Sequence, residues 1–219
     1  RFPLFLTLIK DENLEIRMTL INNLSELNKV IEVNNIIESI MPSIKEISTN
    51  KSWRVRIQIM EIIPVLAKLF NQQLFMNHIF PICIASLTDS VFSIRESACK
   101  LLVTIYKDVK NDEFEKKLLE KLNELCVSTS YLLRNTVLVY VKFFIEKLGD
   151  KIYFDFFEKK LVGIVLMLSK DKIANIRISC GFIWNKIKDV KFKDNRINNE
   201  INLVVENLKK DLDADVVKS

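Results

Sequence analysis

The sequence predicts an all-α fold in which helical hairpins stack side by side as an α-solenoid, forming a right-handed superhelix. Three observations lead to this prediction. A short motif that ends in arginine recurs at an almost constant spacing along the chain. Between the motifs, apolar side chains follow helical spacing. The 219 residues include only three glycines, so tight turns and strand hairpins that rely on glycine must be scarce.

The recurring motif is a polar residue, four mixed residues, and an apolar residue followed by arginine. Successive arginines are 39, 39, 39 and 43 residues apart, at Arg17, Arg56, Arg95, Arg134 and Arg177. The five copies are DENLEIR, NKSWRVR, DSVFSIR, STSYLLR and DKIANIR, and a sixth begins at Asp211 with Val217 in the arginine position. The motif predicts one continuous array over residues 1–219, with repeats at 1–32, 33–71, 72–110, 111–150, 151–193 and a truncated 194–219.

Each repeat is predicted to be a hairpin of two amphipathic helices. In the second helix of repeat 72–110, apolar residues from Val91 to Ile105 return in helical steps and share one face. Neither helix can bury such a face alone, so neighbouring repeats must share a core. Pro42 and Pro81 are expected early in first helices, where a missing N–H costs little. Because terminal repeats need polar caps, we expect the natural protein to extend beyond Arg1.

The polar and basic ends of the motif predict a structural ladder along the turns within the hairpins. An aspartate there can accept hydrogen bonds from N–H groups of the second helix. An arginine six residues later can reach the carboxylate of a neighbouring repeat. Rungs with Asn50, Ser128 or Val217 in place of a charged residue are expected to be weaker. The predicted ladder consists of Asp11, Arg17, Asn50, Arg56, Asp89, Arg95, Asp171 and Arg177.

A period of about 40 residues, with aspartate in the turn and arginine early in the second helix, resembles the HEAT repeat; leucine-rich and tetratricopeptide units are shorter. Within this class, WRVRIQIMEIIPVLA at 53–67 resembles the scaffolding (A) subunit of protein phosphatase 2A. The resemblance continues through SIRESACKLL, YLLR, IANIRISC and DLDADV. The chain is thus similar to the last six of that family's fifteen repeats.

The resemblance implies a non-catalytic scaffold, located in the cytoplasm or also in the nucleus, that organises a phosphatase holoenzyme. It implies that the catalytic subunit of protein phosphatase 2A docks on the turns, whereas regulatory B subunits use N-terminal repeats outside this sequence. Val91 could face the core instead, and Phe92 stands where the family commonly has tyrosine, so a hydroxyl contact is lost there. Carried over by position, the candidate contacts are Trp53, Arg54, Val91, Phe92, Tyr131, Arg134, Ile173 and Asn175.

Three aromatic positions point to a docking surface independently of the resemblance. Trp53, Phe92 and Tyr131 each precede a motif arginine by three residues, and a side chain at this point of a turn should face outward. Exposed aromatic side chains commonly anchor protein interfaces. The alternative is that the rings fold back over the helix ends. The motif arginines are expected to serve the ladder, with Arg134 open to both roles.

The residues of an enzyme site are missing from this sequence. His78 is the only histidine, and no nucleophile motif accompanies it, so we expect neither catalysis nor a cofactor nor a metal. No apolar run approaches the length of about 20 residues that a membrane span needs. The widely spaced cysteines are expected to fill core positions; they are Cys83, Cys99, Cys126 and Cys180.

A basic run near the C-terminus raises an alternative, a HEAT array that binds nucleic acid. The run consists of Lys186, Lys188, Lys191, Lys193 and Arg196. Acidic residues interrupt it, and the net charge of +5 is a mild excess spread along the chain. We therefore do not expect nucleic-acid binding, and the role of the run stays open. A transport receptor would share the fold and differ only in its partner.

Overall fold

The computed structural model describes residues 11, 13, 15–16, 19–20, 23 and 33–219. Most of the predicted first repeat, including Arg17, therefore lies outside the described residues. The chain divides into two compact units, residues 1–114 and 115–219, and each is described by itself.

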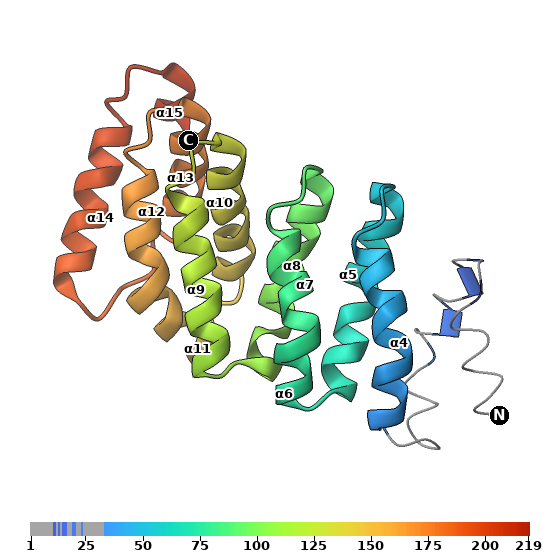
Figure 1. Cartoon of the computed structure of the whole chain (residues 1–219). Helices are drawn as coiled ribbons and strands as arrows, with labels where there is room; N and C mark the ends of the chain where they lie inside the picture. Colours follow the sequence, from blue (N-terminus) through green and yellow to red (C-terminus); the bar gives the residue numbers. More distant parts are fainter. Residues whose placement is uncertain (1–10, 12, 14, 17–18, 21–22, 24–32) are drawn as a thin grey trace. The chain divides into compact units, whose positions relative to one another are not determined.

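The described residues of the first unit form two helical hairpins (Figure 1). One pairs α4 (Val33–Ser48) with α5 (Trp53–Leu69). In the other, the first helix consists of α6 (Gln72–Leu74), the π-helical turn η1 (Phe75–Ile79) and α7 (Phe80–Ser86). The second helix is α8 (Phe92–Val109). Helix α5 packs against both α4 and α8, so the second helices of the two hairpins are neighbours.

The second unit repeats this arrangement. Helix α9 (Asp112–Cys126) begins at the end of the first unit, lies mostly in the second, and is followed by α10 (Tyr131–Ile145). The next hairpin consists of α11 (Lys151–Phe156), the π-helical turn η2 (Phe157–Leu161), α12 (Val162–Leu168) and α13 (Ala174–Lys186). Helices α14 (Asn195–Leu208) and α15 (Ala214–Lys218) complete the unit. Helix α13 packs against α10, α12, α14 and α15.

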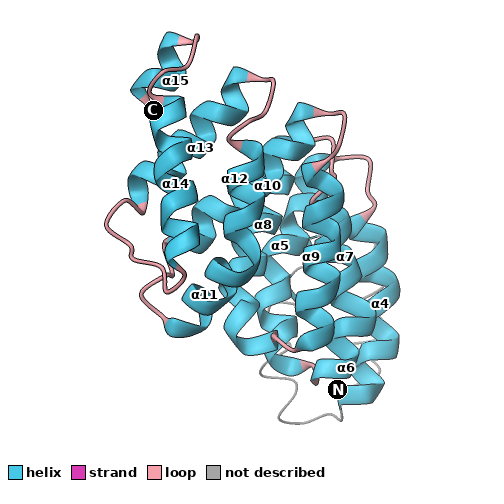
Figure 2. Ribbon diagram, turned by 90° about the vertical axis from the view of Figure 1, so that its left-hand side faces the viewer, coloured by secondary structure: helices cyan, strands magenta, loops and turns pink. Residues whose placement is uncertain are grey.

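The described part of the chain is helical throughout, with loops but no strands (Figure 2). The predicted class, an α-solenoid of helical hairpins, is confirmed. In each unit, the turns within the hairpins lie at one end of the helices, and the connections between hairpins lie at the other end. None of the described helices is long and apolar enough to cross a membrane.

Aromatic side chains from different helices pack together in the core of each unit. Phe114 packs its ring 4.8 Å from that of Phe80 and 6.1 Å from that of Tyr106 in the first unit. In the second unit, Phe144 of α10 contacts Tyr153 and Phe156 of α11, with ring centroids 5.1 and 5.5 Å apart. The contacts of Phe144 join two hairpins of the second unit and contribute burial that neither hairpin could achieve alone.

All four cysteines are buried and free, as predicted. Burial disfavours the thiolate, so the pKa is raised to about 12 for Cys83, about 11 for Cys126 and about 12 for Cys180. It also raises the pKa of Cys99. These thiols are therefore uncharged core groups at neutral pH.

The two π-helical turns change the phase of the first helices. A π-turn adds one residue to a helical turn, so the buried face shifts by one position. Phe156 and Phe157 are consequently both buried at η2, as are Leu161 and Val162. Pro81 is the second residue of α7, which begins immediately after η1. The expectation that Pro42 falls early in its helix is wrong, because α4 begins at Val33 and holds this proline well inside.

Candidate functional site

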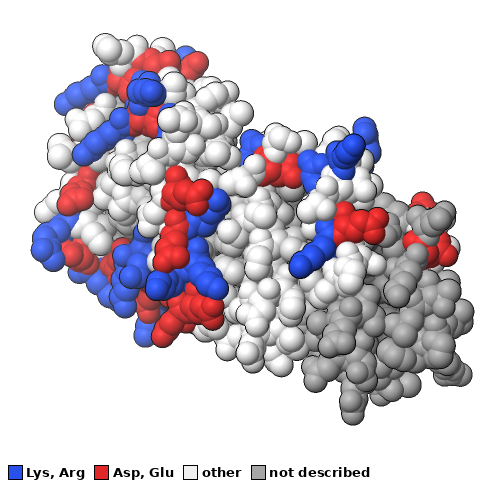
Figure 3. Space-filling model, in the orientation of Figure 1, with Lys and Arg blue, Asp and Glu red and all other residues white. Residues whose placement is uncertain are grey.

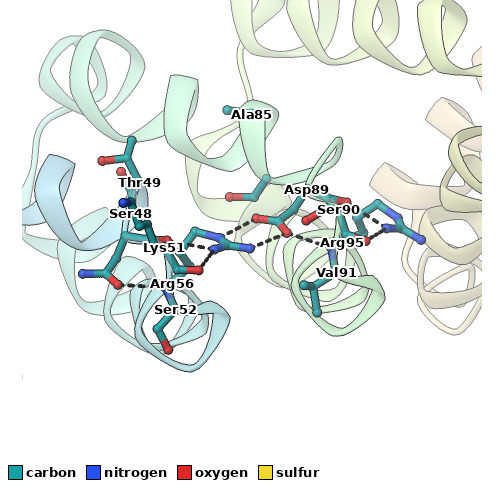
Figure 4. A network of polar contacts seen from close by, with 12 residues as sticks. Ser48, Thr49, Lys51, Ser52, Arg56, Ala85, Asp89, Ser90, Val91 and Arg95 are labelled. Carbon is teal, nitrogen blue, oxygen red and sulfur yellow. Dashed lines mark hydrogen bonds and ion pairs between the residues drawn. The ribbon is translucent and has the colours of Figure 1, made fainter.

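Ion pairs tie successive hairpin turns together within each unit. Arg56 of α5 donates from both Nε and Nη2 to the carboxylate of Asp89, at 2.8 Å for each bond (Figure 4). Arg134 contacts Asp171 in the same bidentate way at 2.6 and 3.0 Å, and Arg177 contacts Asp211 at 2.7 and 2.8 Å. Bidentate pairs fix orientation as well as distance, so each rung holds one turn against the next.

The motif arginines that the structure describes also close their own turns. The Nη1 group of Arg56 donates to the carbonyls of Asn50 and Lys51, and that of Arg95 donates to the carbonyls of Asp89 and Ser90. Arg134 does the same with the carbonyls of Ser128 and Thr129, and Arg177 donates to the carbonyl of Asp171. The sequence pattern did not reveal this second role, because a bond to a backbone carbonyl requires no particular residue as partner.

The turn aspartates act differently from the expectation that they bond to the second helix. Asp89 accepts from the N–H of Val91, and Asp171 accepts from the N–H of Ile173, in each case two residues further on. These acceptors therefore bond to the residue that precedes the helix, since α8 begins at Phe92 and α13 begins at Ala174. The aspartates shape the turn rather than cap the helix.

The arginine partners keep the carboxylates of Asp89, Asp171 and Asp211 ionised. Burial opposes the charge of Asp89 and Asp171, but hydrogen bonds from Arg56 and Arg134 and from backbone N–H groups outweigh it and lower the pKa of both. For Asp211, the hydrogen bond from Arg177 is the main cause of a lowered pKa. The same bonds raise the pKa of the three arginines. These rungs are thus charged pairs at neutral pH.

Three other turn residues form hydrogen bonds within their own turns. The side chains of Asn50 and Ser128 accept from N–H groups two residues further on, those of Ser52 and Ser130. Asp11 accepts from the N–H of Asn13 in the same way. Arg17 lies outside the described residues, so the rung that would join it to Asn50 stays a prediction.

The aromatic residues of the motif occupy one equivalent position and face outward. Trp53, Phe92 and Tyr131 are the first residues of α5, α8 and α10, and their exposed fractions are 37%, 44% and 43%. The guanidinium of Arg54 lies 4.9 Å from the Trp53 ring, and that of Arg95 lies 5.6 Å from the Phe92 ring. These cations lie over the ring faces and leave much of each aromatic surface open to solvent.

The other candidate contacts fall on neighbouring positions of the same turns. Val91 and Ile173 precede their helices and are half-buried, while Arg54 and Asn175, second in their helices, are exposed. Leu132, also second in its helix, is exposed and was not among the predicted contacts.

Arg134 differs from the other candidate contacts because its side chain is buried and already hydrogen-bonded. It bonds to Asp171 and to the Ser128 and Thr129 carbonyls. A guanidinium engaged in this way has little left to offer a partner protein. The ladder is therefore the role that the contacts of Arg134 support.

The described residues offer few groups that could bind a metal or a nucleic acid. No cluster of three or more His, Cys, Asp or Glu side chains that could hold a metal is found among them, and His78 is half-buried. Two members of the basic run are paired with acids, Lys193 with Asp155 and Arg196 with Asp194. On the face drawn in Figure 3, basic and acidic side chains are interspersed over the second unit.

Comparison with known proteins supports the repeat class. The model of the HEAT repeat matches residues 79–109, which is the hairpin of α7 and α8. The chain is 23% identical over 199 residues to serine/threonine-protein phosphatase 4 regulatory subunit 4 of Mus musculus. That alignment covers 84% of this chain, which spans 22% of the mouse protein.

The fold also resembles designed repeat proteins. A designed armadillo repeat protein in complex with the peptide (KR)4 is 14% identical with a TM-score of 0.49, covering 99% of this chain and 95% of that one. Another designed armadillo repeat protein is 13% identical with a TM-score of 0.48, covering 100% and 96%.

Proposed function

We propose that this chain is a non-catalytic subunit of a serine/threonine protein phosphatase and that it holds the catalytic subunit on its hairpin turns. The likeness to a phosphatase 4 regulatory subunit supports the phosphatase class. The resemblance of residues 53–67 and of the later turns to the phosphatase 2A scaffold supports a catalytic subunit of the 2A type. The two sources agree on the reaction class and differ in the catalytic partner.

The observation that carries this proposal is the outward-facing aromatic residue at the start of successive second helices. Trp53 and Phe92 present large apolar surfaces at equivalent points of the first unit, and Tyr131 does so in the second. Partly exposed aromatic side chains in fixed positions lose little conformational entropy on binding and often dominate the affinity of an interface.

The ladder makes these anchors suitable for docking. The pair Arg56–Asp89 fixes the turns that precede Trp53 and Phe92 relative to one another. In the second unit, Trp184 donates from its indole nitrogen to Ser169 at 2.9 Å, which fastens α13 to the end of α12 beside the turn. Anchors on a prearranged surface bind more tightly because less ordering is required on association.

The proposal is tested by the affinity of the 219-residue chain for purified phosphatase catalytic subunits of type 2A and type 4. We expect binding to at least one of them, and we expect Trp53→Ala to weaken it roughly thirtyfold, which corresponds to about 2 kcal/mol. Leu203→Ala is the matched control, because Leu203 is an exposed apolar residue of α14 away from the turns. Failure to bind either catalytic subunit, or equal affinities of the Trp53→Ala variant and the parent, would refute the proposal.

A further inference from the structure

We propose that the groove between α10 and α13, which we call the lysine groove, binds an acidic segment of a partner protein that also carries an aromatic or aliphatic side chain. The lysine groove has a volume of about 530 Å³ and is lined by Lys142, Ile145, Glu146, Phe182, Lys186 and Lys188 among others. This inference does not depend on the phosphatase proposal, because it concerns other residues and another part of the helices.

The apolar part of the groove is an aromatic side chain that the core does not use. Phe182 is 55% exposed, whereas Cys180, Ile183 and Trp184 around it in α13 are buried. The face of α13 that packs on its neighbours is therefore complete without Phe182. An exposed phenylalanine beside the buried Ile145 and Ile183 offers a surface against which an apolar side chain can pack.

The polar part of the groove is predominantly basic. Lys142, Lys186 and Lys188 face one acidic residue, Glu146, around its rim. Within the described residues these three lysines form no ion pair, in contrast to Lys193 and Arg196 of the same basic run. The ammonium group of Lys142 lies 5.9 Å from the centre of the Phe182 ring. Carboxylates entering here would meet an excess of positive charge beside an apolar surface.

The position of the groove separates it from the hairpin turns. Phe182 follows Ala174, the first residue of α13, by eight residues, a distance of about 12 Å along the helix axis. A segment seated on Phe182 therefore contacts the C-terminal ends of α10 and α13 rather than their beginnings.

An acidic protein segment fits this groove better than a nucleic acid does. Nucleic-acid binding relies on many phosphate contacts along an extended basic surface. Here the basic side chains without acidic partners are few and surround one aromatic ring. A short peptide can place one apolar side chain on Phe182 and carboxylates on either side of it.

The test uses the full chain and a fluorescein-labelled heptapeptide with three glutamates on each side of one phenylalanine. We expect saturable binding by fluorescence anisotropy, weakened about thirtyfold by Phe182→Ala and about fivefold by Lys142→Glu or Lys186→Glu. Lys160→Glu is the matched control, since Lys160 is an exposed lysine of η2 outside the groove. This control should bind the peptide like the parent chain.

Three further probes decide what the groove recognises. The peptide with glutamine in place of glutamate should bind more weakly if charge contributes, and the peptide with alanine in place of phenylalanine should bind more weakly if the ring contributes. Single-stranded DNA is the third probe. Absence of peptide binding, equal binding by the Phe182→Ala variant, or tighter binding of DNA than of the peptide at the same salt concentration would each overturn the proposal.

Discussion

Arg134→Ala is expected to lower the free energy of unfolding by about 3–5 kcal/mol, because it leaves the buried carboxylate of Asp171 without its counterion. The side chains of Arg134 and Asp171 are 8% and 7% exposed. The substitution also removes the bonds that close the turn at Ser128 and Thr129. Urea unfolding of the purified variant, followed by circular dichroism, measures the loss.

Two comparisons identify the cause of that loss. Lys209 and Glu206 form an ion pair whose side chains are 60% and 56% exposed, so Lys209→Ala should cost less than about 1 kcal/mol. The double variant Arg134→Met with Asp171→Leu should lose less stability than Arg134→Ala, because it leaves no charge buried alone. A cost for Arg134→Ala as small as that for Lys209→Ala would show that the rung does not hold the turns.

Phe144→Ala is expected to destabilise the second unit by about 3–5 kcal/mol, because it opens a cavity where two hairpins meet. The Phe144 side chain is fully buried, and its ring packs against those of Tyr140, Tyr153 and Phe156. In a stacked array each hairpin is stabilised mainly by its neighbours, so a cavity between two hairpins weakens both. The same urea unfolding experiment measures the change.

Phe182→Ala is the matched control for this effect. It removes the same side chain from an exposed position of α13 and should alter the free energy of unfolding by less than about 0.5 kcal/mol. If Phe144→Ala proves as mild as this control, the aromatic cluster between α10 and α11 does not stabilise the stack.

The fold could be predicted because one local pattern is repeated. Helices α5, α8, α10 and α13 all begin three residues before a motif arginine, at Trp53, Phe92, Tyr131 and Ala174. Arg56, Arg134 and Arg177 each reach both their own turn and the next one, so the spacing of these arginines reflects the register of the hairpins. The turn positions of the candidate site follow from the same spacing.

The sequence does not indicate two other features of the structure. The π-helical turns η1 and η2 each contain one residue more than an α-helical turn. Their sequences, FMNHI and FEKKL, share only the leading phenylalanine, and no residue in them marks the extra position. Similarly, α13 has apolar residues on several sides, including Ile176, Ile178 and Phe182. Its pattern could not show which of them would face solvent, and so the lysine groove was not predicted.

The central claim, that a phosphatase catalytic subunit binds the hairpin turns, is tested most directly by hydrogen exchange of the chain with and without that subunit. The first N–H groups of a helix have no partner within the helix and exchange rapidly unless something covers them. We predict that the catalytic subunit slows exchange at residues 51–55, 90–94, 129–133 and 172–176. Slower exchange confined to the bodies of the first helices, such as α9 and α14, with unchanged exchange at these turns, would contradict the claim.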